Sequence, residues 1–192
     1  MLQGMTPETP TAPSIHHATE TSALRDATID DAEEIEAVHY AAREAVYADR
    51  VEDWPPPGPD RSGRIERWRR WLSTPDIDCI VATASDGIVG FVTVRPSRDD
   101  DAPADMAEMP TLYVHPDHWR RGHGGALCAA SVQRAMNRGF RKLSLWVLDM
   151  NARALVFYRS FGFTPDGATK VDDGTKERLL AHRYVLSLTE AE

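Results

Sequence analysis

The sequence is poor in cysteine: its 192 residues include only two, Cys79 and Cys128. They lie far apart, with neither the CxxC spacing nor the flanking histidine of a zinc site. Neither a disulfide framework nor a metal centre is therefore indicated. Both residues fall in apolar segments, which predicts buried and unreactive thiols.

Long apolar runs and a basic surplus are also lacking. No run approaches the ~20 residues of a membrane-spanning helix, and the N-terminus has no basic start followed by an apolar core, as a secretory signal would. We therefore expect a cytoplasmic protein with no membrane partner. The 22 Lys and Arg residues face 30 Asp and Glu, for a net charge of −8. Because phosphate contacts dominate nucleic-acid affinity, this balance argues against a nucleic-acid partner.

What is present is the composition of a globular protein, with 42% hydrophobic and 27% charged residues. Residues 1–22 are rich in Thr, Pro and Ala and show no hydrophobic period. They are predicted to form a disordered leader. Residues 23–190 are long enough for one domain with a substantial core.

Hydrophobic periodicity and turn residues predict the order β-α-α-β-β-β-α-β-α-β-β. This order indicates an α/β fold in which helices cover the faces of a mixed sheet. Pro110 removes a backbone donor from one strand, which predicts a bulge or an edge. The expected strands cover residues 24–27, 79–84, 88–94, 106–114, 142–148, a piece near 163 and 178–188. One expected helix begins after Thr28 or Asp30, and three others cover 61–72, 122–138 and 152–161.

Residues 114–127 combine a strand end, a loop with two arginines and a helix start with glycines at 122, 124 and 125. A helix N-terminus leaves N–H groups unpaired and favours an anion, and glycines let a phosphate approach closely. Arg120 and Arg121 can add charge-assisted hydrogen bonds. The segment predicts a pyrophosphate site, with a plain Gly-rich turn as the alternative. It is neither a Walker A motif nor a G-x-G-x-x-G fingerprint.

Residues 151–163 form a second informative segment. Asn151 can cap a short helix and Gly162 can end it. Tyr158 follows Asn151 by two turns on the same face, with Ala154 between them. In isolation, a tyrosine at this position is typical of a core side chain with a hydrated hydroxyl.

Together the two segments resemble the GNAT superfamily of acetyltransferases. Its acetyl-CoA motif, Q/R-x-x-G-x-G/A, is matched by residues 119–124, and its second motif, N-x-x-A-x-x-F-Y-x-x-x-G-F, by residues 151–163. The resemblance covers residues 24–188 and implies a single-domain, mostly antiparallel central sheet flanked by helices. Trp119 departs from the pattern, because the family usually has Gln or Arg there. Arg120 or Arg121 could supply the missing phosphate contact.

The resemblance implies that an acetyl group passes directly from acetyl-CoA to a primary amine in a ternary complex, without a metal. The Leu112 N–H would polarise the acetyl carbonyl and the Val114 N–H would hold the pantetheine arm. Tyr158 would protonate the leaving thiolate. The implied acetyl-CoA contacts are Leu112, Val114, Arg120, Arg121, Gly122, His123, Gly124, Gly125, Ala126, Asn151 and Tyr158.

An ammonium group must lose a proton before it can attack a carbonyl carbon, so a base or a chain of waters is needed. Glu108 stands where some family members carry a catalytic glutamate. Leu112 lies four residues further along the strand, or about 13 Å away, so we expect Glu108 to act through water. An ordinary surface glutamate is the alternative, and His182 is a second candidate base.

The acceptor is defined only as a small amine, an amino acid, a peptide or a lysine side chain. The chain segments expected around it are acidic and aromatic, which suits a cationic amine or an ordinary solvated surface. These residues are Glu44, Tyr47, Asp49, Glu52, Asp53, Trp54, Asp99, Asp100 and Asp101.

The helix expected at 61–72 instead carries a basic face. Its arginines could meet CoA phosphates or an acidic substrate, or simply face solvent. A non-catalytic acyl-CoA-binding regulatory module is the alternative function, and a homodimer is one expected assembly. The arginines of this face are Arg64, Arg67, Arg69 and Arg70.

Overall fold

The structure, a computed structural model, describes residues 23–51, 54–55, 58–85, 87–172 and 178–188. The leader expected at 1–22 lies outside these residues, as do Glu52 and Asp53. The helices are α1 (Ala32–Tyr47), α2 (Arg61–Leu72), α3 (His123–Asn137) and α4 (Ala152–Ser160), with short 3-10 turns at Ile29–Asp31 and Pro116–His118. The strands are β1 (Ala23–Asp26), β2 (Asp78–Ala84), β3 (Gly87–Pro96), β4 (Met106–Val114), β5 (Lys142–Leu148), β6 (Thr164–Asp172) and β7 (Leu179–Ser187).

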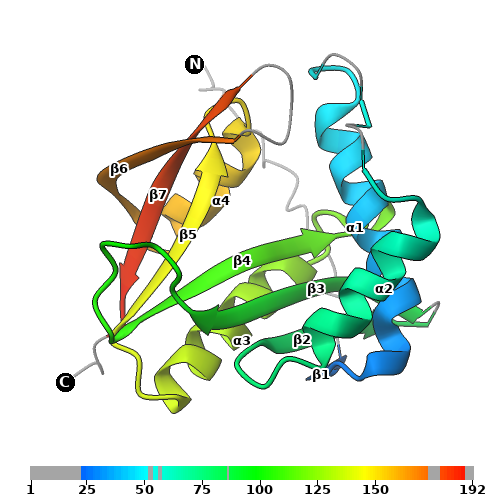
Figure 1. Cartoon of the computed structure of the whole chain (residues 1–192), viewed down its shortest axis with the longest axis horizontal. Coiled ribbons are helices and arrows are strands. Elements are labelled where there is room, and N and C mark those ends of the chain that lie inside the picture. The colour runs from blue at the N-terminus through cyan, green and yellow to red at the C-terminus, as the bar shows by residue number, and fades with distance from the viewer. Residues whose placement is uncertain (1–22, 52–53, 56–57, 86, 173–177, 189–192) are drawn as a thin grey trace, which may run out of the picture.

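These strands form one sheet in the order β1-β2-β3-β4-β5-β7-β6 (Figure 1). Neighbouring strands are antiparallel except for β4 and β5, which are parallel. The predicted element order and the mostly antiparallel sheet are both confirmed. In the described part of the chain, no helix is long and apolar enough to cross a bilayer.

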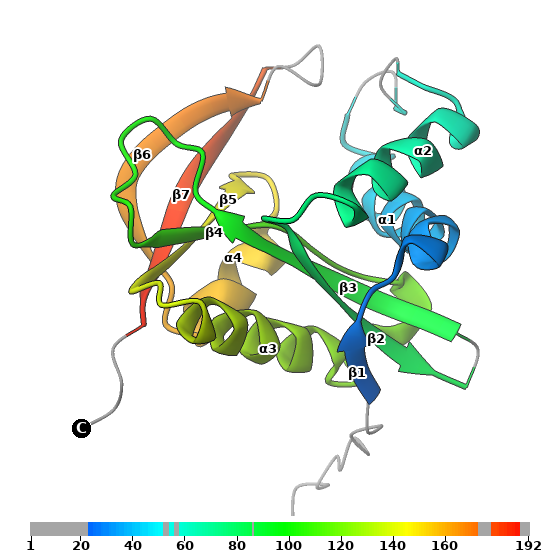
Figure 2. The ribbon, with the colours of Figure 1, turned by 60° about the horizontal axis from the view of Figure 1, so that its bottom comes forward.

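Helices cover both faces of the sheet, with α1 and α2 on one side and α3 on the other (Figure 2). Successive side chains of β3 point to opposite faces of the sheet, so this strand packs against the helices on both sides. Phe91 packs with Ile35 and Trp68 on the α1–α2 side, whereas Val92 packs with Leu127 on the α3 side. Cys79 and Cys128 are free and buried as predicted, and burial raises the pKa of each thiol to about 12.

The irregularity expected at Pro110 is a bulge. Thr93 pairs with Thr111 and Arg95 with Glu108. Between these two pairs β3 has one residue and β4 has two, so the extra residue lies in β4 at Pro110. A bulge bends its strand and increases the local twist. The last four residues of β4 are thereby turned relative to the first four.

An ion pair ties the start of α1 to β1. Both oxygens of Asp31 accept hydrogen bonds from Arg25, at 2.7 and 2.8 Å, and the Thr28 N–H donates to the same carboxylate at 2.7 Å. Hydrogen bonds from Arg25 outweigh the effect of burial and lower the pKa of Asp31 to about 2. Because the folded-state pKa lies below the ordinary value of ~3.9, ionised Asp31 stabilises the fold above that value.

We expect Asp31→Asn to lower the free energy of unfolding at pH 7 by about 1–2 kcal/mol, since Arg25 is partly exposed and screened. The difference from wild type should shrink as the pH falls from ~4 towards ~2, where wild-type Asp31 takes up its proton. Urea unfolding at several pH values measures this difference. Asp30→Asn, at an exposed neighbour, is the control, and a pH-independent difference would contradict the assignment.

Candidate functional site

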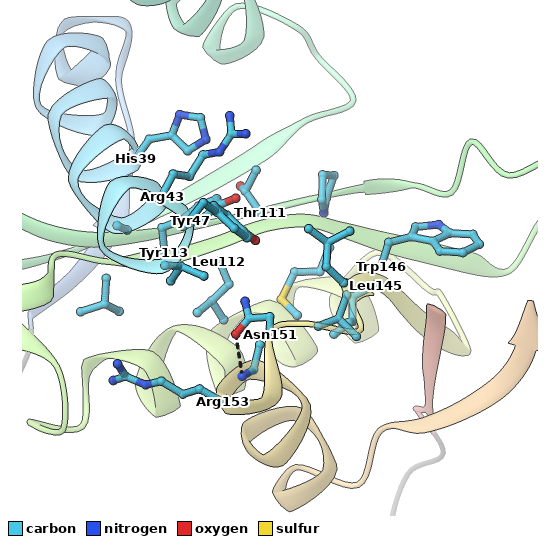
Figure 3. A pocket seen from close by; sticks show the side chains of 18 of the residues that line it. His39, Arg43, Tyr47, Thr111, Leu112, Tyr113, Leu145, Trp146, Asn151 and Arg153 are labelled. Carbon is cyan, nitrogen blue, oxygen red and sulfur yellow. Dashed lines mark hydrogen bonds between the residues drawn. The ribbon is translucent and has the colours of Figure 1, made fainter. Parts of the chain in front are cut away.

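The site begins where β4 and β5 separate. The two strands pair over only three residues, Met106–Glu108 with Lys142–Ser144. Beyond them β5 remains paired with β7 as far as Leu148, and β4 remains paired with β3 as far as Val114. A cleft of about 1060 Å³ opens between the diverging strands and is lined by residues of both, of α1 and α2, and of the starts of α3 and α4 (Figure 3).

The β4 edge in this cleft presents backbone amides. The His115 N–H donates to Val89 O of β3 at 2.8 Å. Because successive N–H groups along a strand point to opposite edges, the N–H groups of Leu112 and Val114 point away from β3 and into the cleft. The Val114 carbonyl, on the same edge, accepts a hydrogen bond of 2.7 Å from Trp119 Nε1.

At one end of the cleft lies the start of α3. Gly122 is its N-cap with φ of +94°, a left-handed conformation that favours glycine. A Cβ built on Gly124 or Gly125 would lie at 3.7 Å from the Phe157 ring and 3.6 Å from the Phe161 ring, which are ordinary contact distances. Packing within the protein therefore does not require glycine at 124 or 125, which leaves close approach by a ligand as a reason for it.

The residues expected at this helix start divide into two groups. Arg120, Gly122, Gly124 and Gly125 line the cleft, whereas Arg121, His123 and Ala126 are not part of its wall. The His123 side chain is 1% exposed, so only its backbone can face an anion. The Ala126 N–H already donates to Gly122 O at 3.0 Å.

The start of α4 faces the same end. Asn151 lines the cleft, and its Oδ1 accepts a hydrogen bond from the Ala154 N–H at 3.1 Å, as predicted for a helix cap. Tyr158 is half-buried in the cleft wall, and its hydroxyl makes no hydrogen bond within the described residues. Burial, and to a lesser extent the nearby Cys128 thiol, raise the pKa of Tyr158 far above its usual range. Tyr158 therefore keeps its proton at neutral pH.

Sequence reasoning missed Arg153. Its guanidinium carbon lies 3.8 Å from the ring centroid of Trp119, close enough for a strong cation–π contact. Burial and the charge of Arg120 lower the pKa of Arg153. Trp119 thus holds a cation from α4 beside Arg120, at the end of the cleft where the motif lacks its usual Gln or Arg. Nothing in the sequence marks Arg153, because the contact joins residues 34 positions apart.

The two candidate bases differ in position. Glu108 is 7% exposed and lines the cleft, and its Oε2 accepts hydrogen bonds of 3.1 and 3.0 Å from Arg95. Its Oε1 makes no hydrogen bond within the described part of the chain. His182 is not in the cleft wall, and its Nε2 lies 2.7 Å from a carboxylate oxygen of Asp149.

The other end of the cleft differs from the acidic surface that the sequence suggested. Asp99 and Asp101 both bind Arg183, at 3.2 and 2.6 Å. Glu44 and Asp49 are not in the cleft wall, although Tyr47 and Trp54 are. The cationic residues that line the cleft away from α3 and α4 are Arg43 of α1, Arg64 and Arg67 of α2, and Lys170 of β6.

No group of three or more His, Cys, Asp and Glu side chains that could hold a metal ion is found among the described residues.

Comparisons with known proteins agree with this geometry. Residues 43–163 match the model of the acetyltransferase (GNAT) family. An uncharacterised N-acetyltransferase of Methanocaldococcus jannaschii is 27% identical over 157 residues, which cover 79% of this chain and 65% of that protein. The chain thus spans just under two thirds of that relative's length.

Two solved structures share the fold. The Salmonella typhimurium protein yncA, solved with its cofactor acetyl-CoA, has a TM-score of 0.67 and 21% identity, over 90% of this chain and 97% of that one. The ribosomal-protein-alanine N-acetyltransferase of Brucella melitensis has a TM-score of 0.69 and 23% identity, over 86% and 99%. With the family model matching more than half of its length, this chain belongs to the GNAT family of acetyltransferases.

Proposed function

We propose that this protein binds acetyl-CoA in the cleft between β4 and β5 and transfers its acetyl group to the nitrogen of a primary amine. The observation that carries the proposal is the unpaired edge of β4, which directs the Leu112 and Val114 N–H groups toward the space between the starts of α3 and α4. An extended arm that carries amide groups can pair with such an edge, as an added strand would.

The cationic end of the cleft fits the pyrophosphate of acetyl-CoA. The N–H groups in the first turn of a helix such as α3 favour an anion, and Arg120 and Arg153 add positive charge beside them. Arg121, which lies outside the cleft wall, would contribute through longer-range attraction. The fitting group is thus a pyrophosphate with an extended amide-bearing arm.

Acetyl-CoA supplies a thioester whose carbonyl carbon is open to attack by an amine. The Leu112 N–H would donate to the carbonyl oxygen, which becomes more negative as the amine nitrogen bonds to the carbon. The C–S bond then breaks. Tyr158 holds its proton at neutral pH and would give it to the departing sulfur as a general acid.

The attacking amine must first lose a proton, and Glu108 is the proposed acceptor of that proton. Its Oε1 is available because Arg95 engages only Oε2. Arg95 also holds the carboxylate in one orientation at the narrow end of the cleft. The three β4 residues between Glu108 and Leu112 leave room for a chain of waters, so the proton would travel through water.

A first experiment is thermal melting with acetyl-CoA, CoA, ATP and NADH. At a hundredfold excess over the dissociation constant, a bound ligand adds about 2.7 kcal/mol, or roughly 5–10 °C for a domain of this size. We expect shifts with acetyl-CoA and CoA only, followed by thiol release when an amine is added. A shift without thiol release for any amine would favour the acyl-CoA-binding module, and no shift would refute the donor site.

For Tyr158→Phe we expect turnover to fall about ten- to a thousandfold, near the range for general acid–base catalysis, with the acetyl-CoA dissociation constant unchanged. Steady-state thiol release and acetyl-CoA melting measure the two quantities. Tyr184→Phe is the control, because it also removes one phenol hydroxyl, from a tyrosine that lies outside the cleft wall. Unchanged turnover in Tyr158→Phe would remove this residue from the mechanism.

For Arg120→Ala combined with Arg153→Ala we expect the acetyl-CoA dissociation constant to rise about ten- to a hundredfold, because two charge-assisted contacts are lost. The salt dependence of binding should also become weaker. Arg69→Ala with Arg70→Ala removes the same charge from the exposed face of α2 and is the control. Equal affinities for the two double variants would mean that the backbone amides alone hold the pyrophosphate.

A further inference from the structure

The end of the cleft away from α3 and α4 is where an acceptor would meet the acetyl group, and its side chains come from α1 and α2. Figure 3 shows His39, Arg43 and Tyr47 on one side of Leu112, with Asn151 and Arg153 on the other. The two ends are thus separated by the edge of β4. If acetyl-CoA occupies the end formed by α3 and α4, the acceptor has the end formed by α1 and α2.

The carboxylates in the wall of this second end are already engaged. Glu36 is 2% exposed and binds Arg64 as well as Trp68 Nε1, at 3.1 Å to the latter. The neighbouring His39 and Arg64 side chains outweigh its burial and lower the pKa of Glu36. Glu108 binds Arg95 at 3.0 Å. Each of these carboxylates thus already has an arginine partner that balances its charge.

Two cations in the same wall are not neutralised. Arg43 and Arg67 have no carboxylate partner among the described residues. Burial, with a further contribution from both arginines, lowers the pKa of His39, so the two charges lie close to this one ring. This end of the cleft therefore carries an excess of positive charge.

Arg43 is also held in place. Its guanidinium carbon lies 5.0 Å from the Trp54 ring and 5.9 Å from the Tyr47 ring. Stacking occupies the faces of a guanidinium and leaves its N–H donors at the edge, where they match a carboxylate or a phosphate in two parallel hydrogen bonds. A half-buried arginine restrained in this way loses less conformational freedom when it binds an anion.

We infer that the acceptor amine carries a compact anionic group, a carboxylate or a phosphate, and that Arg43 binds this group with help from Arg67. This inference rests on the proposed function and names the substrate class of the same site. The fitting acceptors are amino acids, peptides with an acidic group near the reacting amine, and phosphorylated amines. Polyamines do not fit, because their second ammonium group would face Arg43 and Arg67.

The cationic surroundings also assist the chemistry. Positive charge near an ammonium group favours its neutral form, as like charges do for any titratable pair. An acceptor whose anion lies against Arg43 would thus place its amine in a region that promotes proton loss. Proton loss from the amine then depends less on the basicity of Glu108.

The test uses the full chain with isotope-labelled acetyl-CoA and an equimolar mixture of three classes of amine. The classes are amino acids with aminoalkylphosphonates, the corresponding amino-acid amides, and polyamines. Mass spectrometry identifies the acetylated products. We expect the first class to be acetylated at least tenfold faster than the other two, and the split between carboxylates and phosphonates tells which anion the site prefers.

The contribution of Arg43 is read from its variants. For the preferred acceptor, Arg43→Ala should lower kcat/KM about ten- to a hundredfold, mainly through KM, and leave the acetyl-CoA shift intact. Arg43→Lys should recover part of the loss, since a lysine keeps the charge but not the paired donors. Arg69→Ala, on the exposed face of α2, is the matched control and should behave as wild type.

Three outcomes overturn the inference: faster acetylation of amides or polyamines, no labelled anionic product, or an Arg43→Ala variant indistinguishable from wild type. The wild-type melting shift with acetyl-CoA separates these outcomes from failure of the proposed function. If the shift is present, only the acceptor class is refuted. If it is absent, the donor site itself is refuted, and the inference with it.

Discussion

The separation of β4 from β5 is the constraint on which the site depends. Two parallel strands that pair at only three positions leave a row of N–H and C=O groups without a ladder partner. Backbone groups that stay unpaired away from water are costly, so such an edge persists only where water or a ligand satisfies it. The bulge at Pro110 turns the end of β4 away from β5, and the cleft and its amides follow from that turn.

Trp119 links this edge to the positive end of the cleft. Its indole N–H donates to the Val114 carbonyl, and its ring stacks with the Arg153 guanidinium. The family motif places Gln or Arg at this position, so a tryptophan there looks like the loss of a phosphate contact. In the folded structure, Arg153 of α4 supplies a cation beside Trp119. Trp119 thereby occupies the carbonyl of Val114, the residue whose N–H would hold the pantetheine arm. The group that Val114 still offers at this edge is its N–H donor.

Local sequence patterns predicted most of the fold, because helices, strands and turns depend on residues a few positions apart. The strand over Met106–Val114 and the helix over Arg61–Leu72 are confirmed, and of the two irregularities expected at Pro110 the structure has the bulge. Contacts between distant positions could not be predicted in the same way. The pairs Trp119–Arg153, Arg95–Glu108 and Arg183–Asp99 join different elements, and only the packed sheet brings them together. The roles of the candidate site residues remain predictions that this geometry supports.

Net charge was a poor guide to the site for the same reason. The chain has a net charge of −8, yet the acidic run at Asp99 and Asp101 is bound by Arg183, while arginines face the cleft at both ends. A cleft that is lined by charges of one sign and has low-dielectric walls concentrates ligands of the opposite charge, whatever the net charge of the protein. An acidic surface with a cationic cleft would repel anionic substrates everywhere except at the cleft mouth. Charge would then direct both the donor and an anionic acceptor to the place where the amide edge is exposed.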